Sequence, residues 1–468
     1  MGRIAIVSAG LGAGHDGAAK EIGRRLAAAG HQVTCHDFLE LLPGRVGRRV
    51  REAYRRQLDI APGSWEWLLN VLQRSKVMTA LTVWLAATSS KAMLRAFGPD
   101  VDAVVCTYPL AGQVAMRLRR RGRLPASVIT YLTDPFVHPL WLADGTDLFL
   151  APHPEIATQA RLLGAQRVAV VAPAVPPAFR PATDETERAA ARDLFGLPAD
   201  DLLALVLSGS WAVGEIEESA REVAAGGIAT PVVVCGENSA LRERLHDLTP
   251  GVVLGWVDDM PDLMRACDVV LLNSGGLTFF EAHATGVPML AYRCLAGHGR
   301  TNASSLEHAG MATWLHNGSE LTGALATLAA TRSPTRPSVG VGTACPSVAI
   351  SGLVRQPSPA SPREPLVGRR IRRLTVVVAA MAWLLWVVTS GTSLAVEHGF
   401  RAVGETGVQA GDVYFVVEVP TNQPVTGPDV DQLIRLDAAA AVSVTTAAEN
   451  PRAVATVAGA GIVVVNSA

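Results

Sequence analysis

The stretch RIAIVSAGLGAGHDGAAKEIGRRLAAAG, residues 3–30, joins a β-branched run to a glycine-rich turn and then to a helical pattern. It predicts a strand that begins at residue 3, a loop and a helix. An apolar run this short, without the usual flanks, argues against a secretory signal peptide. A strand, loop and helix in this order form the repeating unit of a parallel α/β sheet.

Further strand-like runs alternate with helical patterns on the C-terminal side of this stretch. The first series of expected strands comprises residues 31–38, 102–109, 126–134, 147–152 and 167–173. A second series comprises residues 202–210, 231–236, 251–257 and 268–276. The sequence therefore predicts two Rossmann-like α/β units, at 1–175 and 176–330, with a ligand cleft at the carboxyl ends of their strands.

Three segments of different composition follow the second α/β unit. Residues 331–368 are rich in proline and lack periodicity, which predicts a linker. Residues 374–396 contain no charged side chain and are long enough to cross a bilayer as a helix. Four arginines precede this run, so the positive-inside rule predicts that residues 1–373 are cytoplasmic and that 397–468 form a short extracytoplasmic segment. We assign this last segment no function.

Composition excludes some classes of protein. The 468 residues carry a formal net charge of -1, which excludes a general electrostatic grip on nucleic acid. The six cysteines are scattered without metal-ligand spacing, so we expect free thiols in a reducing compartment. The mean hydropathy of +0.26 is high for a purely soluble enzyme, and the run at 374–396 accounts for part of it.

The first candidate site is the loop that holds Gly10, Gly12, Gly14 and His15. Glycines let the backbone approach a ligand closely, and the helix that follows presents free N–H groups. A dinucleotide-binding loop is the rival interpretation, but the spacing is G-x-G-x-G-H, and no acidic ribose partner lies at the expected distance. A histidine at such a junction faces the cleft and can act as a general base.

The second candidate site is LNSGGLTFFEA, residues 272–282, where a buried strand ends and a helix begins after two glycines. The N–H groups near Gly276 and Thr278 suit a diphosphate, and Glu281 lies one turn into the helix, where it can accept hydrogen bonds from ribose hydroxyls. An ordinary helix start with a first-turn glutamate is the alternative. Asp258 and Asp259 are better explained as a solvated turn than as metal ligands.

Six motifs together resemble one family of glycosyltransferases. They are GAGHDGAAKEI (12–22), YLTDPFVHPLW (131–141), VVCGENSALRERL (233–245), GWVDDMPDLMRACDVVL (255–271), SGGLTFFEAHATGVPML (274–290) and NASSLEHAGMA (302–312). In this order they resemble the GT-B enzymes of the monogalactosyldiacylglycerol synthase and processive diacylglycerol glucosyltransferase group, which are related more distantly to MurG. The resemblance covers residues 1 to about 325.

The resemblance implies an inverting, UDP-sugar-dependent hexosyltransferase that needs no metal and no other cofactor. It implies that His15 is the base and that Asp134 lines the same cleft. The implied UDP-sugar-binding residues are Ser210, Val257, Gly275, Gly276, Thr278, Glu281 and His298. The chain departs from the family at Gly297-His298-Gly299, where Gly-Gln-Glu is usual, and at Asn273-Ser274, where Lys-Pro is frequent.

The expected acceptor side is the basic stretch 44–97, in which arginines such as Arg55 and Arg56 precede Trp65 and Trp67. This pattern is typical of a helix at an anionic membrane surface, and also of a helical hairpin packed on its own domain. The sequence thus predicts transfer of a hexose to diacylglycerol at the cytoplasmic membrane. Two alternatives remain: a polyprenyl-linked wall precursor as acceptor, or a degenerate, non-catalytic protein that binds nucleotide-sugar or lipid.

Overall fold

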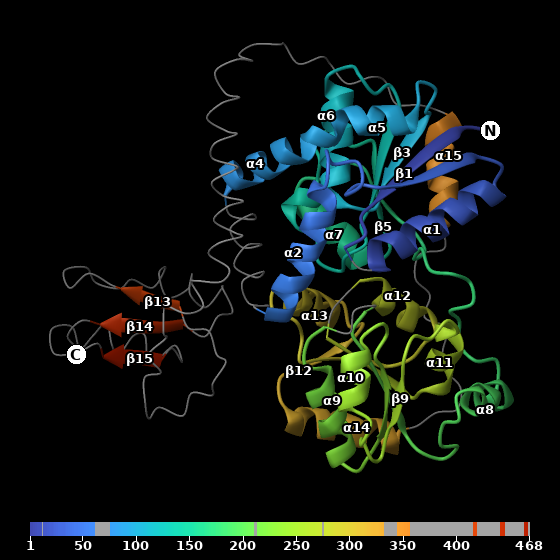
Figure 1. Cartoon of the computed structure of the whole chain (residues 1–468), viewed down its shortest axis with the longest axis vertical. Helices are drawn as coiled ribbons and strands as arrows, with labels where there is room; N and C mark the ends of the chain where they lie inside the picture. The colour runs from blue at the N-terminus through green and yellow to red at the C-terminus, as the bar shows by residue number, and fades with distance from the viewer. Residues whose placement is uncertain are drawn as a thin grey trace. The chain divides into compact units, whose positions relative to one another are not determined.

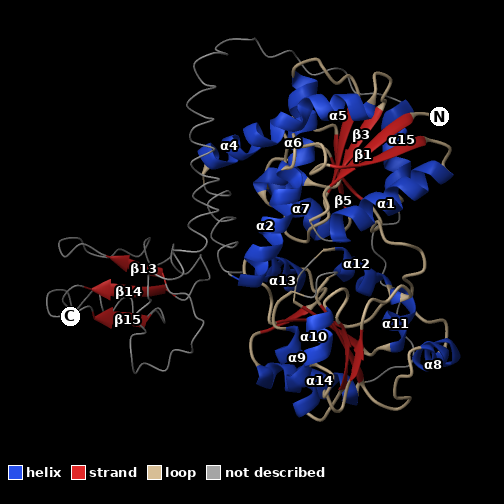
Figure 2. Cartoon of the chain, in the orientation of Figure 1, coloured by secondary structure: helices blue, strands red, loops and turns tan. Residues whose placement is uncertain are grey.

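The computed structural model describes residues 1–11, 13–60, 75–209, 213–273, 276–331 and 344–355, and three short strands between 415 and 466. The chain divides into two units, Met1–Leu394 and Ala395–Ala468. In the larger unit, two six-stranded sheets with every strand pair parallel are flanked by helices (Figures 1 and 2). The two α/β units that the sequence predicts are therefore confirmed.

The first sheet has the strand order β2-β1-β3-β4-β5-β6. Its strands are β1 (Arg3–Ser8), β2 (Gln32–Asp37), β3 (Ala103–Cys106), β4 (Ser127–Tyr131), β5 (Leu148–Ala151) and β6 (Val168–Val170). The helices of this domain are α1 (Ala13–Ala28), α2 (Val46–Ile60), α4 (Lys76–Ala86), α5 (Ser90–Phe97), α6 (Pro109–Arg120) and α7 (Pro154–Leu162). Every residue of β3 and β4 is buried, as expected for strands covered on both faces.

The second sheet has the order β12-β11-β10-β7-β8-β9. Its strands are β7 (Leu203–Leu207), β8 (Thr230–Val234), β9 (Val252–Leu254), β10 (Val269–Leu272), β11 (Met289–Tyr292) and β12 (Thr313–Leu315). Its helices are α8 (Glu185–Leu194), α9 (Ile216–Ala225), α10 (Ser239–Arg244), α11 (Met260–Ala266), α12 (Leu277–Ala284), α13 (His298–His308) and α14 (Gly318–Ala330). The boundary predicted at 175/176 falls between β6 and α8.

A final helix, α15 (Pro346–Arg355), returns to the first domain and lies against α1 (Figure 1). Ile350 is fully buried and Leu353 nearly so, both in the core that β1 and α1 share. Residues 346–355 were expected to belong to the linker at 331–368, so the structure corrects that expectation for this stretch. The reason is that Ile350, Leu353 and Val354 form an apolar helix face, which the flanking prolines obscure.

The smaller unit contains a parallel sheet of three strands, β13 (Phe415–Glu418), β14 (Ala440–Val444) and β15 (Val463–Asn466). These strands fall on the three β-branched runs of the tail. In the part of the chain that the structure describes, no helix combines the length and the apolar character needed to cross a bilayer. The membrane span predicted at 374–396 lies outside the described residues, as does most of 397–468.

Candidate functional site

The topology of the first sheet places the glycine-rich loop at a switch point. After β1 the chain moves to one side to form β2, and it then crosses to the other side to form β3. The loops at the carboxyl ends of β1 and β3 therefore diverge and leave a crevice between them, which is where open α/β sheets bind ligands. The loop that leads from Ser8 to His15 leaves β1 at this point.

His15 lies in the first turn of α1, and residues that follow the neighbouring strands hold it. Its Nδ1 is hydrogen-bonded to Thr133 Oγ1 at 2.9 Å, and its backbone carbonyl accepts a hydrogen bond from Thr107 Oγ1 at 3.1 Å. The ring packs edge-on against Tyr108, with 5.5 Å between the ring centroids. A hydrogen bond at Nδ1 fixes the orientation of the imidazole and leaves Nε2 as the atom that can exchange a proton with a ligand.

Asp134 is linked to His15 through Trp141, and its predicted place in the same cleft stays a prediction. The indole Nε1 of Trp141 donates a hydrogen bond to Asp134 Oδ2 at 3.1 Å, and the Trp141 ring lies 6.0 Å from that of His15. Tyr54 of α2 lies close enough to be affected by Asp134. Burial, and secondarily the negative charge of Asp134, raise the pKa of Tyr54 to about 12. The tyrosine is therefore a neutral hydroxyl in this crevice at physiological pH.

Arg51 of α2 contacts the glycine-rich loop, and the sequence did not predict this role. Its Nε donates to the carbonyl of Gly10 at 2.9 Å, and its guanidinium forms an ion pair with Asp37 at the end of β2. A β-carbon at Gly10 would lie 2.7 Å from the Arg51 guanidinium, so no larger residue fits without displacing the arginine. No local signal in the sequence separates Arg51 from the neighbouring arginines of α2.

The second sheet contains the equivalent switch point between β7 and β10. The loops after these two strands contain the glycines and serines that the sequence assigns to a diphosphate. Gly276 precedes α12 with a φ of 128°, a conformation that favours glycine, and Thr278 follows in the first helical turn. The free N–H groups of that turn, and the positive end of the helix dipole, are available to an anion. Ser210 and Gly275 lie outside the described residues.

Glu281 is half-buried on α12, one turn after Thr278. Burial raises the pKa of its carboxyl group to about 7. A carboxyl group left without a counter-charge in such surroundings is ready to accept hydrogen bonds from a polar ligand. Its position next to the first turn of α12 agrees with the predicted ribose contact, which stays a prediction.

The two candidate sites meet where α1 contacts α12 (Figure 1). Gly14 lies beside the backbone of Leu277, because a β-carbon at this glycine would be in van der Waals contact with the Leu277 nitrogen, at 3.6 Å. At Gly17 a β-carbon would overlap the Leu277 side chain. A third link is the hydrogen bond from the Phe136 N–H to Asn302 Oδ1 at 3.2 Å. The first turn of α1, which carries His15, is thereby held beside the first turn of α12.

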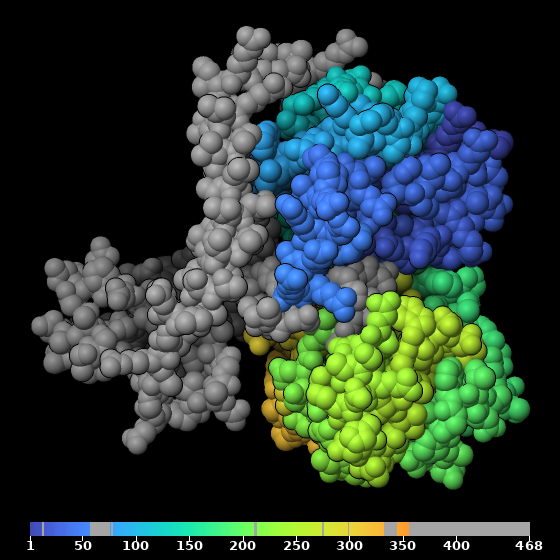
Figure 3. Space-filling view, viewed as in Figure 1, coloured from blue at the N-terminus to red at the C-terminus, as the bar shows by residue number. Residues whose placement is uncertain are grey.

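The other predicted site residues fall into three groups. Val257 follows β9, and its side chain packs on the core, so only its backbone can serve a ligand. Arg55 and Arg56 lie exposed on α2, which is on the visible surface of the first domain in Figure 3. His298 begins α13, but its side chain, like Trp65 and Trp67, lies outside what the structure describes.

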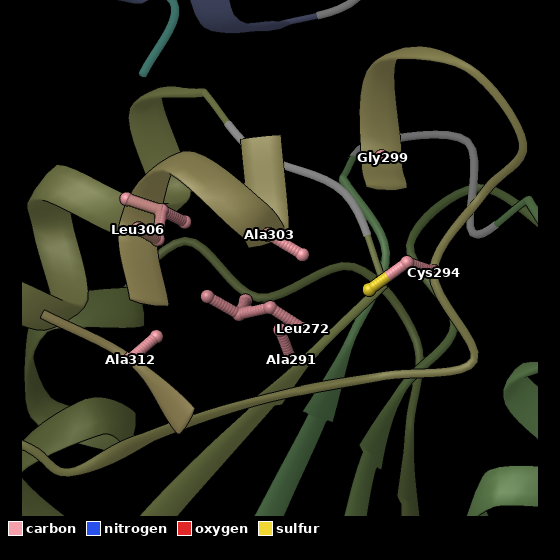
Figure 4. Close-up of a pocket in the computed structure, with 7 residues that line it drawn as sticks. All are labelled: Leu272, Ala291, Cys294, Gly299, Ala303, Leu306 and Ala312. Carbon is pink, nitrogen blue, oxygen red and sulfur yellow. The ribbon is translucent and has the colours of Figure 1, made fainter. Parts of the chain in front are cut away.

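A small cavity lies behind the second switch point (Figure 4). It has a volume of about 10 Å³ and is lined by Leu272, Ala291, Cys294, Gly299, Ala303, Leu306 and Ala312. Burial raises the pKa of Cys294 to about 12, so its thiol is neutral. The cavity holds at most one water molecule and cannot accept a sugar or a nucleotide.

Within the described ranges, no group of three or more His, Cys, Asp or Glu side chains is placed to hold a metal ion. Asp134 accepts a hydrogen bond from Trp141, and Asp37 is paired with Arg51. That the protein needs no metal stays a prediction.

The two parallel sheets with facing switch points define the fold class of the GT-B glycosyltransferases. The structure of Acinetobacter baumannii MurG has this fold and matches with a TM-score of 0.50 and 19% sequence identity, over 76% of this chain and 99% of MurG. In sequence, residues 15–172 match the family model of monogalactosyldiacylglycerol (MGDG) synthase. Residues 211–329 match the family model of the glycosyl transferases group 1. The family resemblance inferred from the motifs is therefore confirmed.

The curated relatives include both kinds of enzyme that the motifs resemble. The processive diacylglycerol β-glucosyltransferase of Bacillus subtilis is 26% identical over 227 residues, which are 47% of this chain and 58% of the relative. Monogalactosyldiacylglycerol synthase 1 of Arabidopsis thaliana is 26% identical over 235 residues, 47% of this chain and 43% of the relative. The matched part of the chain thus spans about half the length of these relatives, 58% of the first and 43% of the second.

Proposed function

We propose that this protein transfers a hexose from a UDP-sugar to the free hydroxyl of diacylglycerol, with inversion at the anomeric carbon. The observation that carries the proposal is the contact between α1 and α12 at Gly14 and Leu277. It sets a histidine suited to be a base beside a helix N-terminus suited to a diphosphate. The family matches of both domains and the names of the relatives support the same reaction.

In this reaction His15 acts on the acceptor hydroxyl, and the start of α12 binds the leaving group. His15 Nε2 accepts the proton of the acceptor hydroxyl as its oxygen bonds to the anomeric carbon. On the other side, the bond between the sugar and the diphosphate breaks, and UDP departs with the electron pair. The N–H groups at the start of α12 stabilise the negative charge that develops on the diphosphate. Attack and departure on opposite faces of the sugar give inversion.

The donor fits the second domain as follows. The diphosphate lies at Gly275, Gly276 and Thr278, with Ser210 in the loop after β7. The ribose hydroxyls donate hydrogen bonds to Glu281, whose carboxyl group is partly buried and has its pKa raised to about 7 by that burial. The uracil is bound by the backbone at Val257, and the sugar lies toward His298. These assignments follow the matched motifs and stand as part of the proposal.

We also propose that the enzyme works at the cytoplasmic face of a membrane that contains anionic lipid. Arg48, Arg49, Arg55 and Arg56 are exposed on α2, and two other residues of this helix face the site: Arg51 contacts the carbonyl of Gly10, and Tyr54 lies near Asp134. Such a helix can lie on an anionic surface while it lines the acceptor side of the site. The run at 374–396 supplies a single membrane span, with 397–468 on the extracytoplasmic side.

The test is an assay of the purified full-length chain with diacylglycerol in mixed micelles and labelled UDP-glucose, UDP-galactose or UDP-GlcNAc. Thin-layer separation of the lipid products identifies which donor is used and how many sugars are added. We expect one labelled glycolipid series with at least one donor. If no donor labels diacylglycerol while a polyprenyl-linked wall precursor becomes labelled, the acceptor is wrong. If neither is labelled although UDP binds, the protein is a non-catalytic binder.

A further inference from the structure

Three loops at the carboxyl end of the second sheet are tied together by Asn273. Its side-chain Nδ2 donates to the Val213 carbonyl in the loop after β7 at 2.8 Å. Its backbone carbonyl accepts from the N–H of Leu295, in the loop after β11, at 2.8 Å. A β-carbon at Gly214 would lie 2.6 Å from Asn273 Nδ2, which shows how closely the first loop packs on it. The loop that leads into α12 is therefore held between its two neighbours.

Arg293 makes a second connection between the outer two of these loops. It follows β11 directly and forms ion pairs with Glu215, which precedes α9, and with Glu222 inside α9, the latter at 2.6 Å. The hydroxyl of Tyr292 donates a hydrogen bond to the same Glu222 carboxylate, and the Arg293 guanidinium lies 5.6 Å from the Tyr292 ring centroid. One arginine thus joins the end of β11 to the start of α9.

The backbone of Arg293 is strained in this arrangement. Its φ is 45°, and no other non-glycine residue in the described ranges has a positive φ. A side chain in this conformation is strained, and such strain persists only where surrounding contacts hold it. Here those contacts are the two glutamates. Because both carboxylates neutralise the guanidinium, Arg293 does not act as a ligand for an anion.

We propose that Arg293 is a positioning residue for the UDP-sugar donor. Its ion pairs fix Glu215 and α9, and thereby keep Val213 and Gly214 beside Asn273, just after β10. This inference rests on the proposed function, because it takes the donor site to lie between the loop after β7 and the start of α12. Arg293 acts through the loop and touches no substrate. Its loss therefore weakens donor binding far more than it slows the chemical step.

Three variants and a control separate the guanidinium from the backbone. Arg293→Gly keeps the positive φ without strain but removes the guanidinium. Arg293→Lys keeps one charge but cannot reach two carboxylates in the same way. Glu215→Gln removes one ion pair and leaves Glu222 in place. The matched control is Arg244→Ala, which breaks an exposed ion pair with Glu217 of the same helix α9 at 2.7 Å and lies away from the three loops.

The experiment is calorimetry of UDP binding to each full-length variant, followed by steady-state kinetics with the UDP-sugar varied. We expect Arg293→Gly to raise the Kd of UDP and the KM of the donor about tenfold or more, with kcat within about twofold. Arg293→Lys should recover part of the affinity, Glu215→Gln should resemble Arg293→Gly, and Arg244→Ala should bind like the wild type.

Each other outcome has a definite meaning. Unchanged UDP affinity in Arg293→Gly, with wild-type binding intact, overturns the inference and leaves the proposed function standing. An equal loss in Arg244→Ala also overturns it, because the effect would then be general destabilisation, which a matched melting curve would show. If the wild-type chain does not bind UDP at all, the donor assignment fails, and the role of Arg293 fails with it.

Discussion

At the scale of single residues, the orientation of His15 depends on one hydrogen bond. Thr133 Oγ1 holds Nδ1 at 2.9 Å, and Trp141 and Tyr108 restrict the ring from two sides. A base that must meet a hydroxyl at hydrogen-bonding distance loses efficiency when its ring can rotate. Substitutions at His15 and at Thr133 therefore test the base assignment in two separate steps.

We expect His15→Ala to abolish transfer and Thr133→Val to lower kcat by about tenfold to a hundredfold, both without change in UDP affinity. The alanine variant lacks the proton acceptor, and the valine variant keeps the shape of the threonine but leaves the imidazole unanchored. Single-turnover rates and calorimetry with UDP measure the two quantities separately. Turnover of His15→Ala at the wild-type rate would show that another group is the base.

The raised pKa of Glu281 makes donor binding dependent on pH. Without ligand, this carboxyl group has a pKa of about 7, so it is mostly protonated below pH 7. If ribose hydroxyls donate to the carboxylate, UDP binding below pH 7 must release a proton. The Kd of UDP should then rise toward a limit of about tenfold per pH unit as the pH falls from 7 to 5. It should stay level above pH 8.

Calorimetry in buffers of different ionisation enthalpy counts the protons released. In Glu281→Gln only the weaker pH dependence that comes from the terminal phosphate of UDP, with its second pKa of about 6, should remain, and UDP should bind more weakly at pH 8. Glu218→Gln, at an exposed position of α9, is the control and should keep the wild-type profile. Uptake of protons on UDP binding, or an unchanged profile in Glu281→Gln, would be incompatible with this role.

At the scale of secondary structure, α15 belongs to the first domain even though the second domain lies between them in sequence. Ile350 is fully buried in the core that α1 and β1 share, and His31 Nε2 is hydrogen-bonded to Ser351 Oγ at 2.9 Å. The backbone of Ala172, just after β6, donates to the carbonyl of Ala344 at 2.8 Å. The chain therefore passes between the two domains twice, once after Ala172 and once before Ala344, and these two residues are hydrogen-bonded to each other.

We expect Ile350→Ala to lower the free energy of unfolding by about 2 to 4 kcal/mol, because it removes buried methyl groups and leaves a cavity. Val348 lies on the same helix but is 67% exposed, so Val348→Ala should change stability by less than about 0.5 kcal/mol. Chemical denaturation of both variants provides the comparison. Equal effects would mean that α15 is not packed on the first domain in solution.

The elements that the sequence could predict are those with continuous apolar runs. β3, β4, β7 and β10 are fully buried, and each coincides with a run of β-branched or leucine residues. β11 (Met-Leu-Ala-Tyr) and β12 (Thr-Trp-Leu) were not singled out, because neither contains the run of β-branched or leucine residues that marks these four strands. Residues 346–355 were predicted to be linker because the stretch around them is rich in proline, and the apolar face of α15 contains only three residues.

At the scale of the whole molecule, the sequence predicts the site only in part. His15, Asp134, Thr278 and Glu281 lie on local motifs, and the two switch points place those motifs in the crevices of their sheets. Arg51 and Thr133 were missed because their roles depend on contacts between distant segments. Arg51 reaches Gly10 from 41 residues away, and Thr133 reaches His15 from 118 residues away. Such pairings follow from the strand order, which no local pattern reveals.

The exposed arginines of α2 predict that the protein binds anionic membranes. Each arginine near such a surface contributes about 1 kcal/mol, so replacing Arg48 and Arg49 by glutamine should weaken binding to phosphatidylglycerol vesicles about 30-fold at low salt. The control replaces Arg121 and Arg123, which are exposed in the turn between α6 and the inner strand β4. Sedimentation with vesicles measures the affinity, and equal losses in both pairs would rule out α2 as the membrane surface.

The central claim is that His15 and the start of α12 form one site for an inverting transfer to diacylglycerol. The anomeric configuration of the product tests it most directly, because the two groups lie on opposite faces of the sugar only in that arrangement. Starting from an α-linked UDP-hexose, proton NMR of the purified glycolipid should show a β linkage, and His15→Ala should yield no product. An α-linked product, or a β-linked product from His15→Ala at the wild-type rate, would contradict the account.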